Sequence, residues 1–119
     1  MKRRYRLRRK PEFQAALKGR RIFSGRGLVA LAVPSQRDEG RVGITVSRQL
    51  KTAVDRNRAR RRLREVARLG LLADSGGGRW GIRYDVVLIA RPAALTLRFA
   101  DLKEETEQAA LRITKPTNP

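Results

Sequence analysis

The stretch SRQLKTAVDRNRARRRLREVAR, from Ser47 to Arg68, decides how the rest of this chain is arranged. It contains neither glycine nor proline, and most of its residues favour a helix, so it predicts a helix of about five turns. On a wheel of about 100° per residue, one side holds four small or apolar residues: Ala59, Leu63, Val66 and Ala67. We therefore expect this side of the helix to pack against a sheet.

The opposite side of the predicted helix is strongly basic. It carries Asn57, Arg60, Arg61, Arg64 and Arg68, and the apolar Val54 also projects toward it. A face that only keeps a protein soluble usually mixes both signs of charge, whereas this stretch has two acids, Asp55 and Glu65. Arginine binds phosphate through two parallel hydrogen bonds and stacks on bases. A solvated charged face and a phosphate-binding ridge are both open, and we favour the ridge.

The composition of the whole chain points to the same kind of partner. Its 119 residues include 29 Lys and Arg against 11 Asp and Glu, a net charge of +18. Such an excess is typical of proteins that bind polyanions. The length suits a single domain over residues 1–119, which we divide into a basic arm at 1–10, the folded body and a flexible tail at 114–119.

Several functional classes are excluded by what the sequence lacks. It has no cysteine and no histidine, which removes disulfides, zinc fingers and the commonest general base. The 11 carboxylates show no spacing expected of an acid–base couple or a two-metal site, so we predict neither catalytic residues nor a metal site. No apolar run is long enough to span a membrane, and the basic N-terminus lacks the apolar stretch of a signal peptide. We expect a cytoplasmic binding module with no membrane partner.

The remaining segments predict an α+β fold. Residues 11–18 read as a short helix, and residues 25–34 and 41–47 as two strands that pair in an antiparallel hairpin across a turn at 36–40. The continuous apolar run at 84–90 predicts a strand inside the sheet. Residues 99–113 read as a last helix, whose inward residues are Leu102, Ala109, Ala110 and Ile113. The glycines at 76–78 predict a flexible loop, and Trp80 receives no role. Helices and strands in this order give a two-layer α/β sandwich.

The type of nucleic acid can be narrowed from the same residues. With three Phe, two Tyr and one Trp, the chain lacks the aromatic strands of an RNA-recognition motif. A leucine-zipper DNA-binding helix would need leucine heptads after the basic region, and Gly70 ends the helix instead. DNA is therefore set aside as a partner. A structural RNA-binding protein of the ribosomal type remains an alternative.

Two motifs resemble the bacterial ribonuclease P protein family. RVGITVSR at 41–48, followed by AVDRNRARRRLRE at 53–65, is similar to the strand and the Arg-Asn-Arg helix of that family. YDVVLIARP at 84–92 is similar to a second family strand, and the segment from Leu7 to Phe13 resembles the family's beginning. The likeness extends over most of the chain.

The resemblance implies a fold and a function. The fold would be a sandwich in the order α-β-β-β-α-β-α, like that of a ribosomal protein domain, with a βαβ crossover of the rare left-handed kind. The protein would join the large catalytic RNA of ribonuclease P, one protein per RNA, and the complex would remove the five-prime leader of precursor tRNA. The RNA, with Mg²⁺, would carry out the chemistry.

The resemblance also assigns residues to each ligand. RNA contacts would come from eight residues: Arg48, Arg56, Asn57, Arg58, Arg60, Arg61, Arg64 and Arg68. A cleft between the first helix and the sheet would hold the single-stranded leader, lined by Phe13, Leu17, Val29, Leu31 and Ser47. Leu17 stands where the family often has an aromatic residue, and Leu31 where it has tyrosine. Because stacking is worth about 1–3 kcal/mol per base, leader contacts here should be more apolar and less stacked.

Overall fold

The computed structural model describes residues 6–7, 10–35, 40–70 and 84–114. Over these ranges the chain forms helices α1 (Lys10–Leu17), α2 (Ala53–Gly70) and α3 (Phe99–Thr114), and a short 3-10 helix η3 (Pro92–Leu95). The strands are β1 (Arg20–Ser24), β2 (Leu28–Pro34), β3 (Arg41–Val46) and β4 (Tyr84–Ala90). The α+β class and the predicted order of elements are confirmed. Most of the basic arm, the glycine loop at 76–78, Trp80 and the tail beyond residue 114 lie outside the described ranges.

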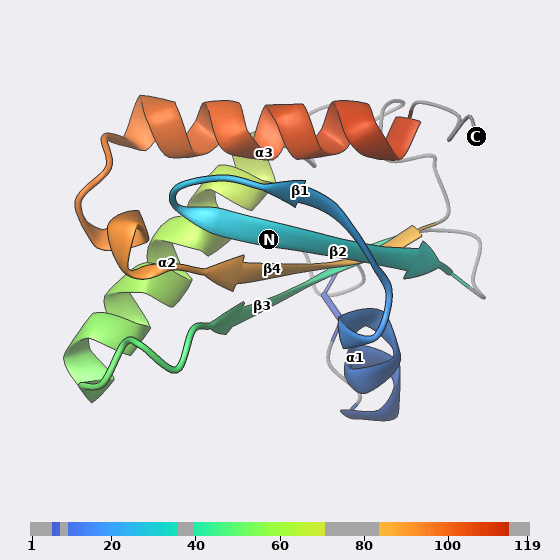
Figure 1. Ribbon diagram of the computed structural model, residues 1–119, viewed down its shortest axis with the longest axis horizontal. Coiled ribbons are helices and arrows are strands. Elements are labelled where there is room, and N and C mark those ends of the chain that lie inside the picture. The colour runs from blue at the N-terminus through green and yellow to red at the C-terminus, as the bar shows by residue number, and fades with distance from the viewer. Residues whose placement is uncertain (1–5, 8–9, 36–39, 71–83, 115–119) are drawn as a thin grey trace.

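The sheet has the strand order β1-β2-β4-β3 (Figure 1). Strand β4 runs antiparallel to β2 and parallel to β3, and it separates the two. The predicted hairpin between residues 25–34 and 41–47 is therefore wrong. The true hairpin joins β1 to β2. β4 takes the place between β2 and β3 because its apolar residues are buried on both faces of the sheet.

Helix α2 connects the parallel strands β3 and β4 and lies behind the sheet in Figure 1. The crossover from β3 through α2 to β4 is left-handed, against the usual rule for such units. The helix begins later than the sequence indicated, at Ala53. Thr52 precedes it as the N-cap, because its Oγ1 accepts a hydrogen bond from the backbone N–H of Asp55 at 3.1 Å.

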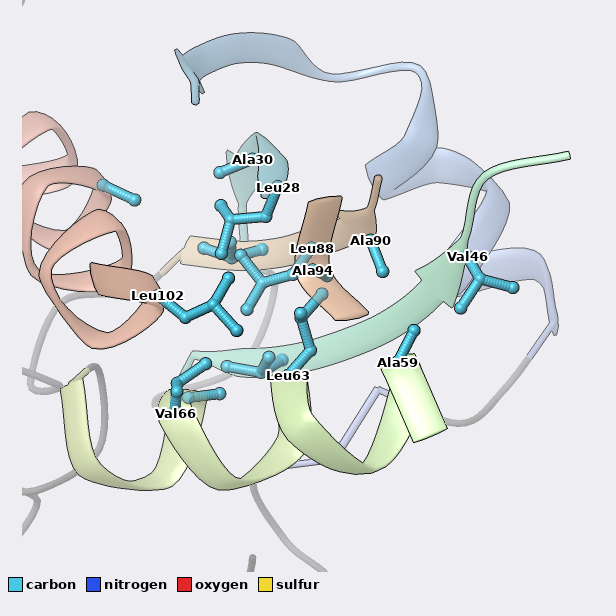
Figure 2. Packing of buried hydrophobic residues seen from close by; sticks show 14 of the residues in the cluster. Leu28, Ala30, Val46, Ala59, Leu63, Val66, Leu88, Ala90, Ala94 and Leu102 are labelled. Atoms are coloured by element: carbon cyan, nitrogen blue, oxygen red, sulfur yellow. The ribbon is translucent and has the colours of Figure 1, made fainter. Parts of the chain in front are cut away.

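The main core lies between the sheet and the two long helices (Figure 2). Leu28, Leu88 and Ala90 point from the strands toward α2, and Leu102 reaches in from α3. The four residues predicted for the inner side of α2 are fully buried: Ala59, Leu63, Val66 and Ala67. On α3 the prediction is confirmed for Leu102, Ala109 and Ala110, while the side chain of Ile113 lies outside the description.

The other face of the sheet is covered only in part. Helix α1 packs at one end of it, where Ala16 and Leu7 bury the side chain of Val87. In Figure 1, α1 stands in front of this end, and no described helix covers the rest of the face. The two faces thus differ: one is a closed core, and the other is partly open.

Candidate nucleic-acid interface

Three arginines at and before α2 are exposed and have no partner within the described part of the chain. Arg48, Arg58 and Arg61 make no hydrogen bond or ion pair there, and their side chains face solvent. Val54, which the wheel placed on this side, is 68% exposed. Because these guanidinium groups make no hydrogen bond or ion pair with the described residues, an external anion can bind them without breaking such an interaction there.

Two further basic residues pair only with neighbours on the same helix. Arg60 donates from Nη1 to Oδ1 of Asn57 at 3.0 Å. Arg68 forms an ion pair with Glu65, and its hydrogen bond lowers the pKa of that carboxyl group below its usual value. Exposed pairs of this kind contribute little stability. A phosphate group can therefore readily replace Asn57 as the partner of Arg60, or Glu65 as the partner of Arg68.

Two arginines of the same cluster contribute to the fold. Arg62 donates from Nη1 and Nη2 to the backbone oxygens of Ala94 and Leu97, at 2.6 and 2.7 Å, and so ties α2 to η3. Arg56 donates from Nη1 to the backbone oxygen of Leu50 at 2.9 Å, which fixes the turn before α2. Arg56 keeps Nε and Nη2 without a partner in the described ranges. Two of its three guanidinium nitrogens are therefore without a partner in the described chain and open to an external anion.

The open face of the sheet is defined by strand register. Val29 pairs with Ile89, and Ile89 with Thr45, so these three side chains form one row across β2, β4 and β3. Val29 is buried, whereas Ile89 and Thr45 are half-buried. The row next to it consists of Leu31, Val87 and Gly43.

Helix α1 forms the wall beside this floor. The ring of Phe13 lies directly on Gly43, because a Cβ atom added at that glycine would lie 2.6 Å from Phe13 Cε2. Leu17, one turn further along α1, is 37% exposed. Of the five positions predicted for the cleft, Phe13 and Leu17 thus lie on α1, and Val29 and Leu31 lie on β2.

The fifth position, Ser47, lies at the far end of the floor. It follows β3, and its backbone N–H donates to the oxygen of Ala90 at 2.8 Å, beside the end of β4. The next residue after β4 is Arg91, which donates from Nη2 to Oγ of Ser24 at 3.2 Å. Ser47 and Arg91 are therefore the first residues after two neighbouring strands. Arg91 was not among the site residues predicted from the sequence.

A small hollow of about 120 Å³ lies where α1, β3 and α2 meet. It opens at the outer edge of β3, and its lining includes Arg6, Phe13, Ile44 and Arg64. Nε of Arg64 is buried there without a hydrogen-bond partner in the described chain. Phe13 and Arg64, predicted for different ligands, thus meet at one place. Sequence reasoning did not select Arg6 or Ile44, and the alternation of residues 41–47 indicated only that Ile44 lies on the core face of β3.

Metal binding and membrane insertion find no support in the described residues. No group of three or more acids in residues 6–7, 10–35, 40–70 and 84–114 is placed to hold a metal ion. Within the same ranges, no helix is long and apolar enough to cross a membrane. These features define a small, basic α+β protein that has an arginine-rich helix on one face of its sheet and a partly open opposite face.

Comparison with known proteins identifies the family. The ribonuclease P family model matches residues 1–114, so the chain belongs to the ribonuclease P protein family. The ribonuclease P protein component of Chloroflexus aurantiacus is 37% identical over 123 residues, covering 99% of this chain and 86% of that relative.

Solved structures agree with this family. The RNase P protein of Staphylococcus aureus superposes with a TM-score of 0.69 at 28% identity, covering 93% of this chain and 95% of the other. The RNase P protein of Thermotoga maritima gives a TM-score of 0.64 at 26% identity, covering 84% and 89% of the two chains. Each similarity extends over most of both chains, so it concerns the whole fold and not a single motif.

Proposed function

We propose that this protein binds the catalytic RNA of ribonuclease P through α2 and the five-prime leader of precursor tRNA through the cleft beside α1. Membership of the family makes it a ribonuclease P subunit with a general role in tRNA processing, associated with the RNase P RNA. The observation that supports the RNA-binding part most strongly is the exposed guanidinium groups of Arg58 and Arg61 on α2, which have no partner among the described residues.

The α2 surface is suited to phosphates arranged along a folded RNA. Arg58 and Arg61 lie three positions apart and are therefore neighbours on the helix surface. Arg48 precedes the helix, and Arg64 extends the series toward the cleft. A row of guanidinium groups can bind successive phosphates with charge-assisted hydrogen bonds. The same row carries no base-reading specificity, so shape and backbone position would guide the docking.

The cleft is suited to a single strand. Its floor is apolar, and Phe13 offers one aromatic edge at the wall. Because Leu17 and Leu31 are aliphatic, we propose apolar contacts with the leader in place of stacking at these two positions. The hollow that holds Arg64 would place a positive charge beside the strand where it passes from the cleft toward α2.

We propose that the bond-breaking step belongs to the RNA. Among the described residues, no group of three or more acids is placed to hold a metal ion. Mg²⁺ would be held mainly by the RNA, and the protein would supply binding and orientation of the substrate. A subunit that acts on precursor tRNA would work in the cytoplasm, with one protein per RNA.

The test is to mix the protein with a bacterial RNase P RNA and a precursor tRNA at low magnesium. We expect faster leader removal than with the RNA alone, because added positive charge and leader contacts replace part of the cation requirement. A matched reaction with an unrelated protein of equal net charge controls for simple charge screening. Equal cleavage with and without the protein would reject the proposed function and favour a purely structural RNA-binding role.

A further inference from the structure

A buried ion network joins α1 to the sheet. Arg41, the first residue of β3, donates from Nη1 to Oε1 of Glu12 at 2.9 Å and from Nη2 to Oδ2 of Asp85 at 3.3 Å. The side chains of Arg41 and Asp85 are 6% and 8% exposed, and that of Glu12 is 36% exposed. The guanidinium group is therefore fixed from the sheet side by Asp85 and reaches outward to the helix.

The position of the network explains why it matters for α1. Arg41, Asp85 and Val33 form the row of the sheet that lies under the first turn of the helix. A cavity of about 260 Å³ lies at the same place, lined partly by Pro11, Val33 and Asp85. The first turn thus rests over open space, and side-chain packing there is incomplete. The Glu12–Arg41 ion pair supplies a direct contact across this gap.

Within the described residues, few other interactions hold α1, although Glu12 itself has a further interaction. The helix has eight residues, and isolated helices of this length are marginal in water. Ala16 is its only buried residue, and Phe13 packs on the sheet while remaining half-buried. A segment with so little buried surface belongs to the least stable part of a fold. The ion pair therefore contributes a large share of what holds α1 on the sheet. Helices α2 and α3, in contrast, are held by the main hydrophobic core.

We propose that the Glu12–Arg41 ion pair, held in place by Asp85, latches α1 onto the sheet and so sets the geometry of the leader cleft. Glu12 is then a positioning residue, since it acts on the leader through its neighbour Phe13. The proposal rests on the proposed function in one respect, namely that the ligand of the cleft is the leader.

The latch has a quantitative consequence. If only the docked state of α1 binds the leader, the apparent affinity falls in proportion to the docked fraction. Linkage requires the converse as well, so a bound leader must hold α1 in the docked state. Neither effect extends to contacts made by Arg58 and Arg61 of α2, which packs on the opposite face of the sheet.

The test compares Glu12→Gln with Glu107→Gln in the assembled ribonucleoprotein. Both substitutions remove one negative charge, and Glu107 pairs with Lys103 on α3 at 3.7 Å, on the other side of the sheet. Affinity is measured for precursor tRNA with its leader and for mature tRNA without it. We expect Glu12→Gln to weaken binding of the precursor about tenfold, as loss of one charge-assisted contact allows, with mature tRNA unchanged. Glu107→Gln should match the wild type for both.

Hydrogen exchange on the free protein gives a second measurement that needs no RNA. Amides of α1 should exchange faster in Glu12→Gln than in the wild type, while those of α2 and α3 keep their protection. Unchanged exchange in α1, or equal weakening for both tRNAs, would overturn the latch. If the wild-type protein shows no leader-dependent affinity, the proposed function fails, and the exchange experiment still decides whether Glu12 holds α1.

Discussion

Replacing Arg58 and Arg61 by alanine tests the arginine face of α2 without disturbing the fold. Both side chains are exposed and have no partner in the described part of the chain. Within the described part of the chain, removing these two exposed side chains breaks no hydrogen bond or ion pair, so stability should change by no more than about 0.5 kcal/mol. A thermal unfolding curve that overlays the wild type would establish that any change in RNA affinity arises at the interface.

The expected effect follows from counterion release. Each phosphate contact adds roughly 0.7 to 0.9 to the slope of log affinity against log salt concentration. If both arginines bind a phosphate, the slope becomes shallower by about 1.4 to 1.8. Between about 50 and 200 mM salt, the affinity gap between wild type and variant should then shrink roughly 7- to 12-fold.

The assay is filter binding of the protein to RNase P RNA at several salt concentrations. The matched control is Arg98→Ala with Lys103→Ala. These two residues lie just before and within α3, and each pairs with an acid of that helix, so the control removes the same charge away from α2. The control should leave the slope close to that of the wild type. An unchanged slope for the α2 variant would refute the reasoning, and so would an equal change in the control.

Three other substitutions separate fold from interface. Gly43→Ala should displace the ring of Phe13, because the new Cβ would lie 2.6 Å from it; we expect weaker leader binding and a loss of about 1–3 kcal/mol from overpacking, both measurable in one preparation. Arg62→Met removes the two hydrogen bonds to η3 and should lower the free energy of unfolding by about 1–3 kcal/mol, with little change in the salt slope; a large change in slope would show that Arg62 binds RNA. Glu105→Ala should cost a similar amount, about 1–3 kcal/mol, because this carboxylate accepts hydrogen bonds from the backbone N–H groups of residues 26–28; denaturant unfolding with an unchanged midpoint would contradict this.

Residue periodicity predicted burial well in this chain. The wheel of α2 separated Leu63 and Val66 from the arginines correctly, because a helix that packs on a sheet must bury one stripe. The apolar run at 84–90 predicted an interior strand for the same reason, and β4 is flanked on both sides. In each case the spacing of apolar residues predicts which side chains are buried and which are exposed to solvent.

Periodicity does not report which strands are neighbours. The hairpin predicted between residues 25–34 and 41–47 was wrong because proximity in sequence was used in place of pairing information. The run from Leu28 to Val33 already indicated burial on both faces, and such a strand needs a partner on each side. Strand β1 escaped notice because Arg20 and Arg21 are exposed and only Ile22 is buried.

The arginine cluster shows a second limit of sequence reasoning. Arg61 and Arg62 are adjacent and chemically identical, yet the first faces solvent and the second binds two backbone oxygens of the η3 region. Their difference depends on where the chain places Ala94 and Leu97, more than thirty residues later. Charge counting over such a helix therefore overestimates the groups that are free for RNA.

The pairing of Arg6 and Leu7 with β3 has a practical consequence for preparing this protein. The backbone N–H of Leu7 donates to the oxygen of Val42 at 2.9 Å, so the beginning of the chain is attached to the outer edge of the sheet. A purification handle fused ahead of Met1 would therefore be close in sequence to Arg6, which lines the hollow together with Phe13 and Arg64. A handle at the other end would instead follow α3, which packs on the other face of the sheet.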